Sequence, residues 1–215
     1  MSLIGTIVSK SRRPVIVIGH GVRSSDSVSK LQRFQSHTQI PVVYTASCPD
    51  VFALSDEACI GSVGTLGCSR SGNFALQNAD LILIFGNRMN SVVTGDDRSK
   101  FGRDAKVIMI DIDRSEASKK TINIDHFVHA DLSAFLDQIN CVEFSLDLKS
   151  WILQCQLWKS SLPSLFIDKE HGRPVDLHTL CNDLSIRLPN DATLVTDSGS
   201  IELIFPCLLY TSDAA

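Results

Sequence analysis

Two glycines near the start of the chain could let the backbone approach a phosphate. Gly19 and Gly21 follow a short apolar run, and glycines at such a strand-to-helix turn can bring backbone N–H groups close to a pyrophosphate. The match to a dinucleotide-binding motif is incomplete, because Ser24 occupies the third glycine position and no acidic residue ends the second strand, where Tyr44, Thr45 and Ala46 stand. We therefore expect no ordinary NAD binding, and a tight turn explains the glycines as well as a ligand does.

A second glycine-rich segment runs from Gly61 to Cys68. Gly61, Gly64 and Gly67 recur at every third position, which is too dense for a helix and too long for a hairpin turn. Two interpretations stay open: a loop that wraps around a ligand, or a structural turn. Cys68 lies where it could touch such a ligand, although a packing cysteine is the simpler interpretation.

Polar side chains also follow the two most apolar runs of the chain. Arg88 comes just after Gly86, where an arginine can grip a phosphate or stack on a ring, or simply face solvent. Asp111 and Asp113 end the next run, where a carboxylate can accept hydrogen bonds from ribose or ribityl hydroxyls or cap the following helix. No spacing of histidine, serine, cysteine or carboxylate residues indicates a catalytic group. The seven cysteines lack the pairing typical of a metal site, so no metal ligand is predicted either.

Continuous apolar runs predict the strands that position these residues. Runs at 14–19, 41–44, 81–86 and 107–112 are too uniformly apolar for strands with one wet face, which favours a parallel sheet covered on both sides. Helices are predicted at 27–37 and 72–80, another crossover from Ser115, and a last strand at 127–128 before a helix capped by Asp131 or Ser133. Residues 1–140 are thus expected to form an α/β domain with a Rossmann-like parallel sheet flanked by helices.

The remaining residues predict a linker and an incomplete second unit. Residues 141–174 are interpreted as a linker with one amphipathic helix around Trp151–Trp158. A truncated second α/β unit is expected at 175–206, with a helix at 175–188 and a strand at 192–197. Residues 207–215 resemble the translation of a sequencing adapter and are expected not to belong to the natural protein.

Composition favours a globular protein that binds small molecules. The 215 residues are 44% hydrophobic, and the net charge of −4 at pH 7 is made of mixed acids and bases, which predicts no nucleic-acid or membrane partner. No apolar run is long enough to span a bilayer, and the first ten residues do not resemble a signal peptide. A cytoplasmic location is expected, with an organelle-targeting segment upstream left open.

Taken together, these segments resemble the central domain of acetolactate synthase large subunits and related thiamine-diphosphate enzymes. Residues 86–95 are similar to the family's G-x-R-F-D-D-R-V-T-G, and residues 107–113 follow at the usual interval. The segment 60–67, with 78–81 after it, is similar to the family's G-x-x-G-x-x-G loop and A-D-L strand entry. The resemblance covers about residues 12–140 in order.

The resemblance implies FAD in this domain, as a structural cofactor that takes no electrons in the main reaction. The residues that would line it are Gly19, Gly21, Gly64, Gly67, Gly86, Arg88, Asp111, Ile112 and Asp131. This sequence departs from the family at 90–92, where Asn-Ser-Val replaces Asp-Asp-Arg. Several related 2-oxo acid decarboxylases share the fold without a flavin, so FAD binding stays open.

Residues 184–200 resemble the start of the family's cofactor-binding domain. There Gly199 and Ser200 would approach the diphosphate of thiamine diphosphate, although Glu202 stands where the family has an uncharged residue. The family's catalytic glutamate domain and its Mg²⁺ motif do not occur in the sequence, so the chain alone is expected to be inactive.

The intact parent, with thiamine diphosphate and Mg²⁺, would be a homo-oligomer. It would join a carbon unit from a decarboxylated 2-oxo acid such as pyruvate to a second carbonyl compound. The alternatives are a flavin-free 2-oxo acid decarboxylase of the same superfamily and a nucleotide-binding domain without catalytic activity.

Overall fold

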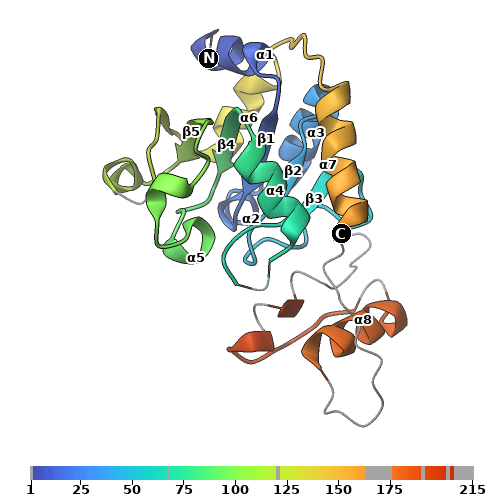
Figure 1. Ribbon diagram of the computed structural model, residues 1–215. Coiled ribbons are helices and arrows are strands. Elements are labelled where there is room, and N and C mark those ends of the chain that lie inside the picture. Colours follow the sequence, from blue (N-terminus) through green and yellow to red (C-terminus); the bar gives the residue numbers. More distant parts are fainter. Residues whose placement is uncertain are drawn as a thin grey trace.

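The main body of the chain is built on a six-stranded sheet in which all strands are parallel (Figure 1). The computed structural model describes residues 2–66, 68–119, 122–162, 176–189, 192–201 and 204–205. The strand order is β3-β2-β1-β4-β5-β6, so the order reverses between β1 and β4. The strands are β1 Pro14–Ile18, β2 Val42–Tyr44, β3 Cys59–Ser62, β4 Leu81–Phe85, β5 Lys106–Asp111 and β6 His126–His129.

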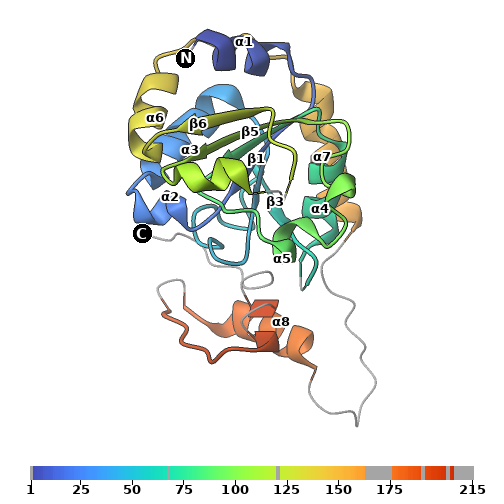
Figure 2. The ribbon, with the colours of Figure 1, turned by 90° about the vertical axis from the view of Figure 1, so that its left-hand side faces the viewer.

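Helices cover both faces of this sheet. Figure 2 shows α3 and α6 on one side of the strands and α4 and α7 on the other. The helices are α1 Ser2–Lys10, α2 Gly21–Ser24, α3 Val28–Thr38, α4 Arg70–Asn78, α5 Ser91–Thr94, α6 Leu132–Ile139, α7 Lys149–Ser161 and α8 Leu177–Arg187, with 3₁₀ turns η1 Arg98–Lys100 and η2 Arg114–Ser118. The predicted α/β class with a flanked parallel sheet is confirmed.

Two apolar cores explain why the central strands have no polar positions. On one face, Phe85 of β4 packs between Phe34 of α3 and Phe135 of α6, with ring centroids 5.9 and 6.0 Å away. On the other face, Val17 and Ile84 belong to a core that α4 and α7 cover. Every residue of β1 and β4 is buried, as expected for strands between two helical layers.

The segment predicted as a linker contributes one of these covering helices. Trp151 of α7 is buried, and its indole Nε1 donates a hydrogen bond of 2.9 Å to the carbonyl of Pro14 at the start of β1. The rings of Trp158 and Phe74 lie 5.8 Å apart and join α7 to α4. The predicted amphipathic helix is therefore present and packs on the sheet domain.

Several local predictions need correction. The glycine-rich loop was expected to begin at Gly61, but Gly61 and Ser62 belong to the edge strand β3, Cys59–Ser62. Neither this strand nor the first helix, Ser2–Lys10, was predicted. The crossover expected from Ser115 is the 3₁₀ turn η2, because this connection between β5 and β6 is short. The strand expected at 192–197 does not form in the described residues, since no neighbouring strand is present there to pair with it.

Other predictions are confirmed or lie outside the described residues. Asp131 caps α6 by accepting a hydrogen bond of 3.0 Å from the Ala134 amide, and Asp113 caps η2. Helix α8 forms where residues 175–188 predicted one. Residue 67, residues 163–175 and residues 206–215 lie outside the described part, and the domain boundaries stay predictions.

Buried thiols give a test of this packing. Burial raises the pKa of Cys48, Cys59 and Cys155 to about 12, whereas Cys141 is exposed. At about pH 8, near the ordinary pKa of a free thiol, we expect iodoacetamide to modify Cys141 first and the three buried thiols only after unfolding. Peptide mass spectrometry of native and denatured samples measures this. Equal rates for all four thiols in the native sample would contradict the described core.

Candidate functional site

A cleft opens at the carboxyl edge of the sheet, where the strand order reverses between β1 and β4. Its volume is about 480 Å³, within the usual range for small-molecule sites. Open α/β sheets bind ligands at this point because the loops after the two strands diverge there. The lining residues are His20, Gly21, Ser24, Ser25, Ser47, Gly86, Asn87, Arg88, Asn90, Ile110, Asp111, Ile112, Asp131 and Leu132.

The floor of the cleft is a contact between two backbones. The Gly21 amide donates a hydrogen bond of 2.9 Å to the Gly86 carbonyl. A Cβ atom added to Gly21 would lie 2.6 Å from the Gly86 Cα, and Gly86 has a φ of +60°. One added to Gly19 would lie 2.7 Å from the Gly86 carbonyl oxygen. These glycines are therefore needed for loop-to-loop contact, which supports the tight-turn interpretation of Gly19 and Gly21.

Asn87, which was not among the predicted site residues, joins the loops around this floor. Its side chain is nearly buried; Nδ2 donates to Thr45 Oγ1 at 3.0 Å, and Oδ1 accepts from the Met89 amide at 2.7 Å. Thr45 in turn follows β2, and its amide donates to the Ile18 carbonyl. The amide side chain thus links the ends of β2 and β4. Its place between Gly86 and Arg88 was the only signal that could have revealed it.

Arg88 stands on the wall of the cleft and contacts a buried acid. Its side chain is 71% exposed, and its Nε lies 3.5 Å from Oε1 of Glu116, whose side chain is 1% exposed. Lys119 contacts the same oxygen, while Glu116 Oε2 has no hydrogen-bond partner among the described residues. Hydrogen bonds from Ser115 lower the pKa of nearby Asp113, and the charges of Arg88 and Lys119 lower it further.

Two carboxylates face the cleft from neighbouring elements. Asp111 Oδ1 accepts a hydrogen bond of 2.8 Å from the Asp113 amide, and Asp131 Oδ1 caps α6. Among the described residues, no hydrogen bond occupies the second oxygen of either carboxylate, so both can accept from hydroxyl donors. Ile112 adds an apolar side chain that is 67% exposed. The cleft therefore combines one arginine with two acids and an apolar surface.

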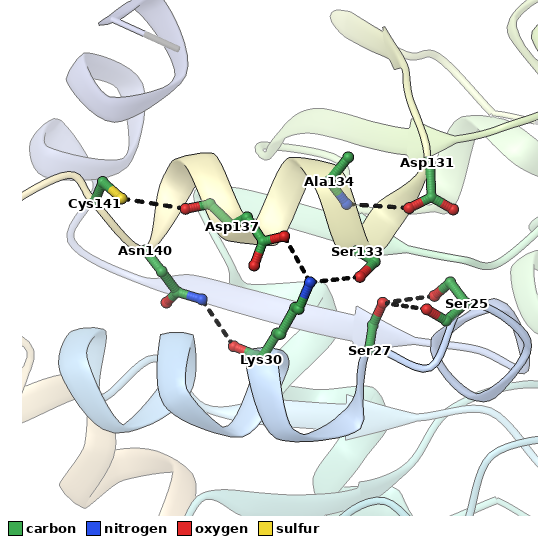
Figure 3. Close-up of polar contacts among 9 residues, drawn as sticks. All are labelled: Ser25, Ser27, Lys30, Asp131, Ser133, Ala134, Asp137, Asn140 and Cys141. Carbon is green, nitrogen blue, oxygen red and sulfur yellow. Dashed lines mark hydrogen bonds and ion pairs between the residues drawn. The ribbon is translucent and has the colours of Figure 1, made fainter.

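Figure 3 shows the polar contacts that hold α6 to α3. Lys30 Nζ donates to Ser133 Oγ at 2.7 Å and to Asp137 Oδ2 at 2.6 Å, and Asn140 Nδ2 donates to the Lys30 carbonyl at 3.0 Å. The hydroxyl groups of Ser25 and Ser27 lie 2.7 Å apart at the start of α3. Lys30 and Asn140 thus link α6 to α3 close to Ser25 and Asp131, two of the residues that line the cleft.

Six of the eleven predicted site residues line this cleft. They are Gly21, Gly86, Arg88, Asp111, Ile112 and Asp131. Gly19 packs beneath it. Their part in binding remains a prediction, because the geometry shows only that they converge.

The other predicted residues lie elsewhere. Gly64 has a φ of +145° and packs against the Val92 carbonyl of α5, which favours the structural-turn interpretation of its loop. Cys68 lies beside it, its Sγ 3.0 Å from the position of a Cβ on Gly64. Gly67 lies outside the described residues. Gly199 and Ser200 are exposed; Gly199 has a φ of +113° and open space where a Cβ would stand.

The described residues contain neither a metal-binding cluster nor a membrane-spanning helix. No three His, Cys, Asp or Glu side chains converge there in a way that could hold a metal ion. In the same part of the chain, no helix has the length and apolar character needed to cross a bilayer.

Comparison with known proteins gives one consistent result. Residues 4–139 match the family model of the thiamine pyrophosphate enzyme central domain. A probable acetolactate synthase large subunit of Methanocaldococcus jannaschii is 29% identical over 92% of the chain and 34% of its own length. The acetolactate synthase large subunit of Lactococcus lactis is 32% identical over the same shares. The mitochondrial acetolactate synthase catalytic subunit of Saccharomyces cerevisiae is 28% identical over 86% of the chain and 28% of its own length. The chain thus spans about a third of these relatives.

The contact at the cleft floor predicts the effect of a single methyl group. In Gly21→Ala the new Cβ would meet three Gly86 backbone atoms within 3.0 Å, none of which can rotate away. We expect the free energy of unfolding to fall by about 1–3 kcal/mol, measured by urea denaturation. Ser24→Ala, in the same helix and also on the cleft wall, is the matched control and should change stability by less than about 0.5 kcal/mol. Equal stability of the two variants would refute a requirement for glycine at position 21.

Proposed function

We infer the function from one premise: the chain belongs to the thiamine-diphosphate-dependent enzymes of the acetolactate synthase type. We propose that it is the central part of a carboligase or lyase that acts on 2-oxo acids. The observation that carries this proposal is the match of residues 4–139 to the central domain, combined with a cleft at the expected edge of the sheet. Since the chain spans 34% of the first relatives, the reaction itself is proposed for the intact enzyme.

We propose further that the cleft holds the nucleotide part of FAD. The residues present fit such a group in three respects: Arg88 offers donors to a phosphate, Asp111 and Asp131 offer acceptors to ribose or ribityl hydroxyls, and Ile112 offers an apolar contact. When bound, the flavin would serve as a structural cofactor. Val92, which replaces the family's arginine, is 42% exposed and does not line the cleft. The absence of that arginine therefore leaves this donor set intact.

The segment around Gly199 is our candidate for the first contact with thiamine diphosphate. Its backbone at φ +113° suits glycine, and the open space at the Cβ position leaves room for a diphosphate to approach the Ser200 amide. Thiamine diphosphate, with Mg²⁺, would supply the carbanion chemistry. The chain's own contribution would be to bind one end of the cofactor. We propose a homo-oligomeric parent, and its location in the cell stays a proposal between cytoplasm and organelle.

The intact enzyme, expressed from the complete native gene, tests the proposal. With pyruvate, thiamine diphosphate and Mg²⁺ we expect acetolactate to form, and removal of both cofactors by chelation and gel filtration should abolish the activity until they are restored. The 215-residue chain alone, as the control, should form none. Release of acetaldehyde without acetolactate would instead support the decarboxylase alternative.

The same preparation tests the flavin. The purified enzyme should show visible flavin absorbance, and denaturation should release FAD into the filtrate for chromatography. A colourless enzyme with full activity would overturn the FAD proposal while leaving the carboligase proposal in place.

A further inference from the structure

Glu116 is the most unusual charged group in the described part of the chain. Its side chain is 1% exposed, its Oε2 has no hydrogen-bond partner there, and its Oε1 contacts both Arg88 and Lys119. A buried carboxylate costs free energy unless its oxygens are paired, and each such buried polar atom calls for an explanation. The floor and helix packing described above do not use this residue.

The geometry at Arg88 indicates what the acid does. The contact of 3.5 Å is made by Nε, on the inner side of the guanidinium, while the side chain as a whole is 71% exposed on the cleft wall. A guanidinium has five N–H donors in a rigid plane, so fixing Nε also fixes the direction of the terminal donors. Lys119 contacts the same oxygen but does not line the cleft.

We propose that Glu116 is a positioning residue of the cleft: it anchors Nε of Arg88, so that the terminal guanidinium donors bind the phosphate of a nucleotide. This inference rests on the proposed nucleotide cleft. If Glu116 anchors Arg88, removing the charge of Glu116 should change the affinity for an anion in the direction opposite to that expected from simple electrostatics. Coulomb attraction alone would tighten anion binding when the negative charge of Glu116 is removed, whereas loss of the anchor loosens it.

Calorimetric titration of the full chain with ADP shows whether each substitution weakens or tightens nucleotide binding. Arg88→Met should weaken ADP binding by about tenfold, the effect of one charge-assisted hydrogen bond. Glu116→Gln should weaken it by about three- to tenfold, because a neutral amide oxygen holds the guanidinium more weakly than a carboxylate does. The double variant should bind no more weakly than Arg88→Met, because Glu116 acts only through the arginine. Adenosine, which lacks the phosphates, should bind the wild type and Glu116→Gln equally.

Two further variants test whether ADP binding depends on the position of the Glu116 carboxylate or only on the charges of the cluster. Glu116→Asp keeps the charge but withdraws the carboxylate by one methylene, and should weaken ADP binding as Glu116→Gln does. Glu116→Asp also replaces Glu116→Gln in this test if the Gln variant does not fold, as judged by the lack of a cooperative thermal transition. Lys119→Met removes a cation from the same cluster and should change ADP affinity by less than about twofold, because that side chain lies off the cleft.

The outcomes distinguish this inference from the function on which it rests. Failure of the wild-type chain to bind ADP would overturn the nucleotide cleft and the inference together. Wild-type binding that weakens in Arg88→Met but is unchanged or tighter in Glu116→Gln would overturn the inference alone. An equal loss of adenosine affinity in Glu116→Gln would also overturn it, since a general structural role would then account for the effect.

Discussion

The close contact of two backbones, where the strand order reverses between β1 and β4, determines the geometry of the loops that line the cleft. Strands β1 and β4 are paired over their whole length, from Pro14 opposite Leu81 to Ile18 opposite Phe85. Their loops therefore leave the sheet at the same level and meet at once, with Gly21 bonded to Gly86. A side chain on either residue would have to push the loops apart. At this contact the cleft is lined by main chain, and a Cβ atom on either glycine would crowd the opposite backbone.

Strand register then places the walls. Phe85 pairs with Ile110 and Asp111 pairs with His129, so the loops after β4, β5 and β6 also leave the sheet close to one level. Arg88, Asp111 and Asp131 each stand within three residues of such a strand end. Because neighbouring parallel strands lie about 5 Å apart, these side chains fall within the span of a single nucleotide. Their convergence follows from the sheet, together with the left-handed backbone at Gly86 and Met89 in the loop that carries Arg88.

Much of this could be predicted from the sequence, and the failures share physical causes. Runs such as Leu81–Phe85 can be predicted as buried strands because every position is apolar. Asp131 could be predicted because aspartate is a preferred residue at the N-terminal cap of a helix. Cys59–Ser62 escaped detection because an edge strand with a glycine has a weak pattern. The role of Asn87 depends on Thr45, 42 residues away, and no local spacing encodes that contact. For the same reason the burial of Glu116 beside Arg88 could not be foreseen.

The Lys30–Asp137 ion pair and the ion-paired Glu116 differ in what they can contribute to stability. The Lys30–Asp137 pair is largely exposed, with side chains 34% and 61% accessible, so it contributes at most about 1 kcal/mol. The aromatic contacts of Phe85 with Phe34 and Phe135 must therefore do most to hold α3 and α6 on the sheet. Glu116 is different, because burying its carboxylate opposes folding, and an apolar residue of similar size would often be at least as stable. Because stability alone does not favour a buried Glu116, its contact with Arg88 is the better explanation for it. Arg88 lines the cleft, and Glu116 forms an ion pair with it.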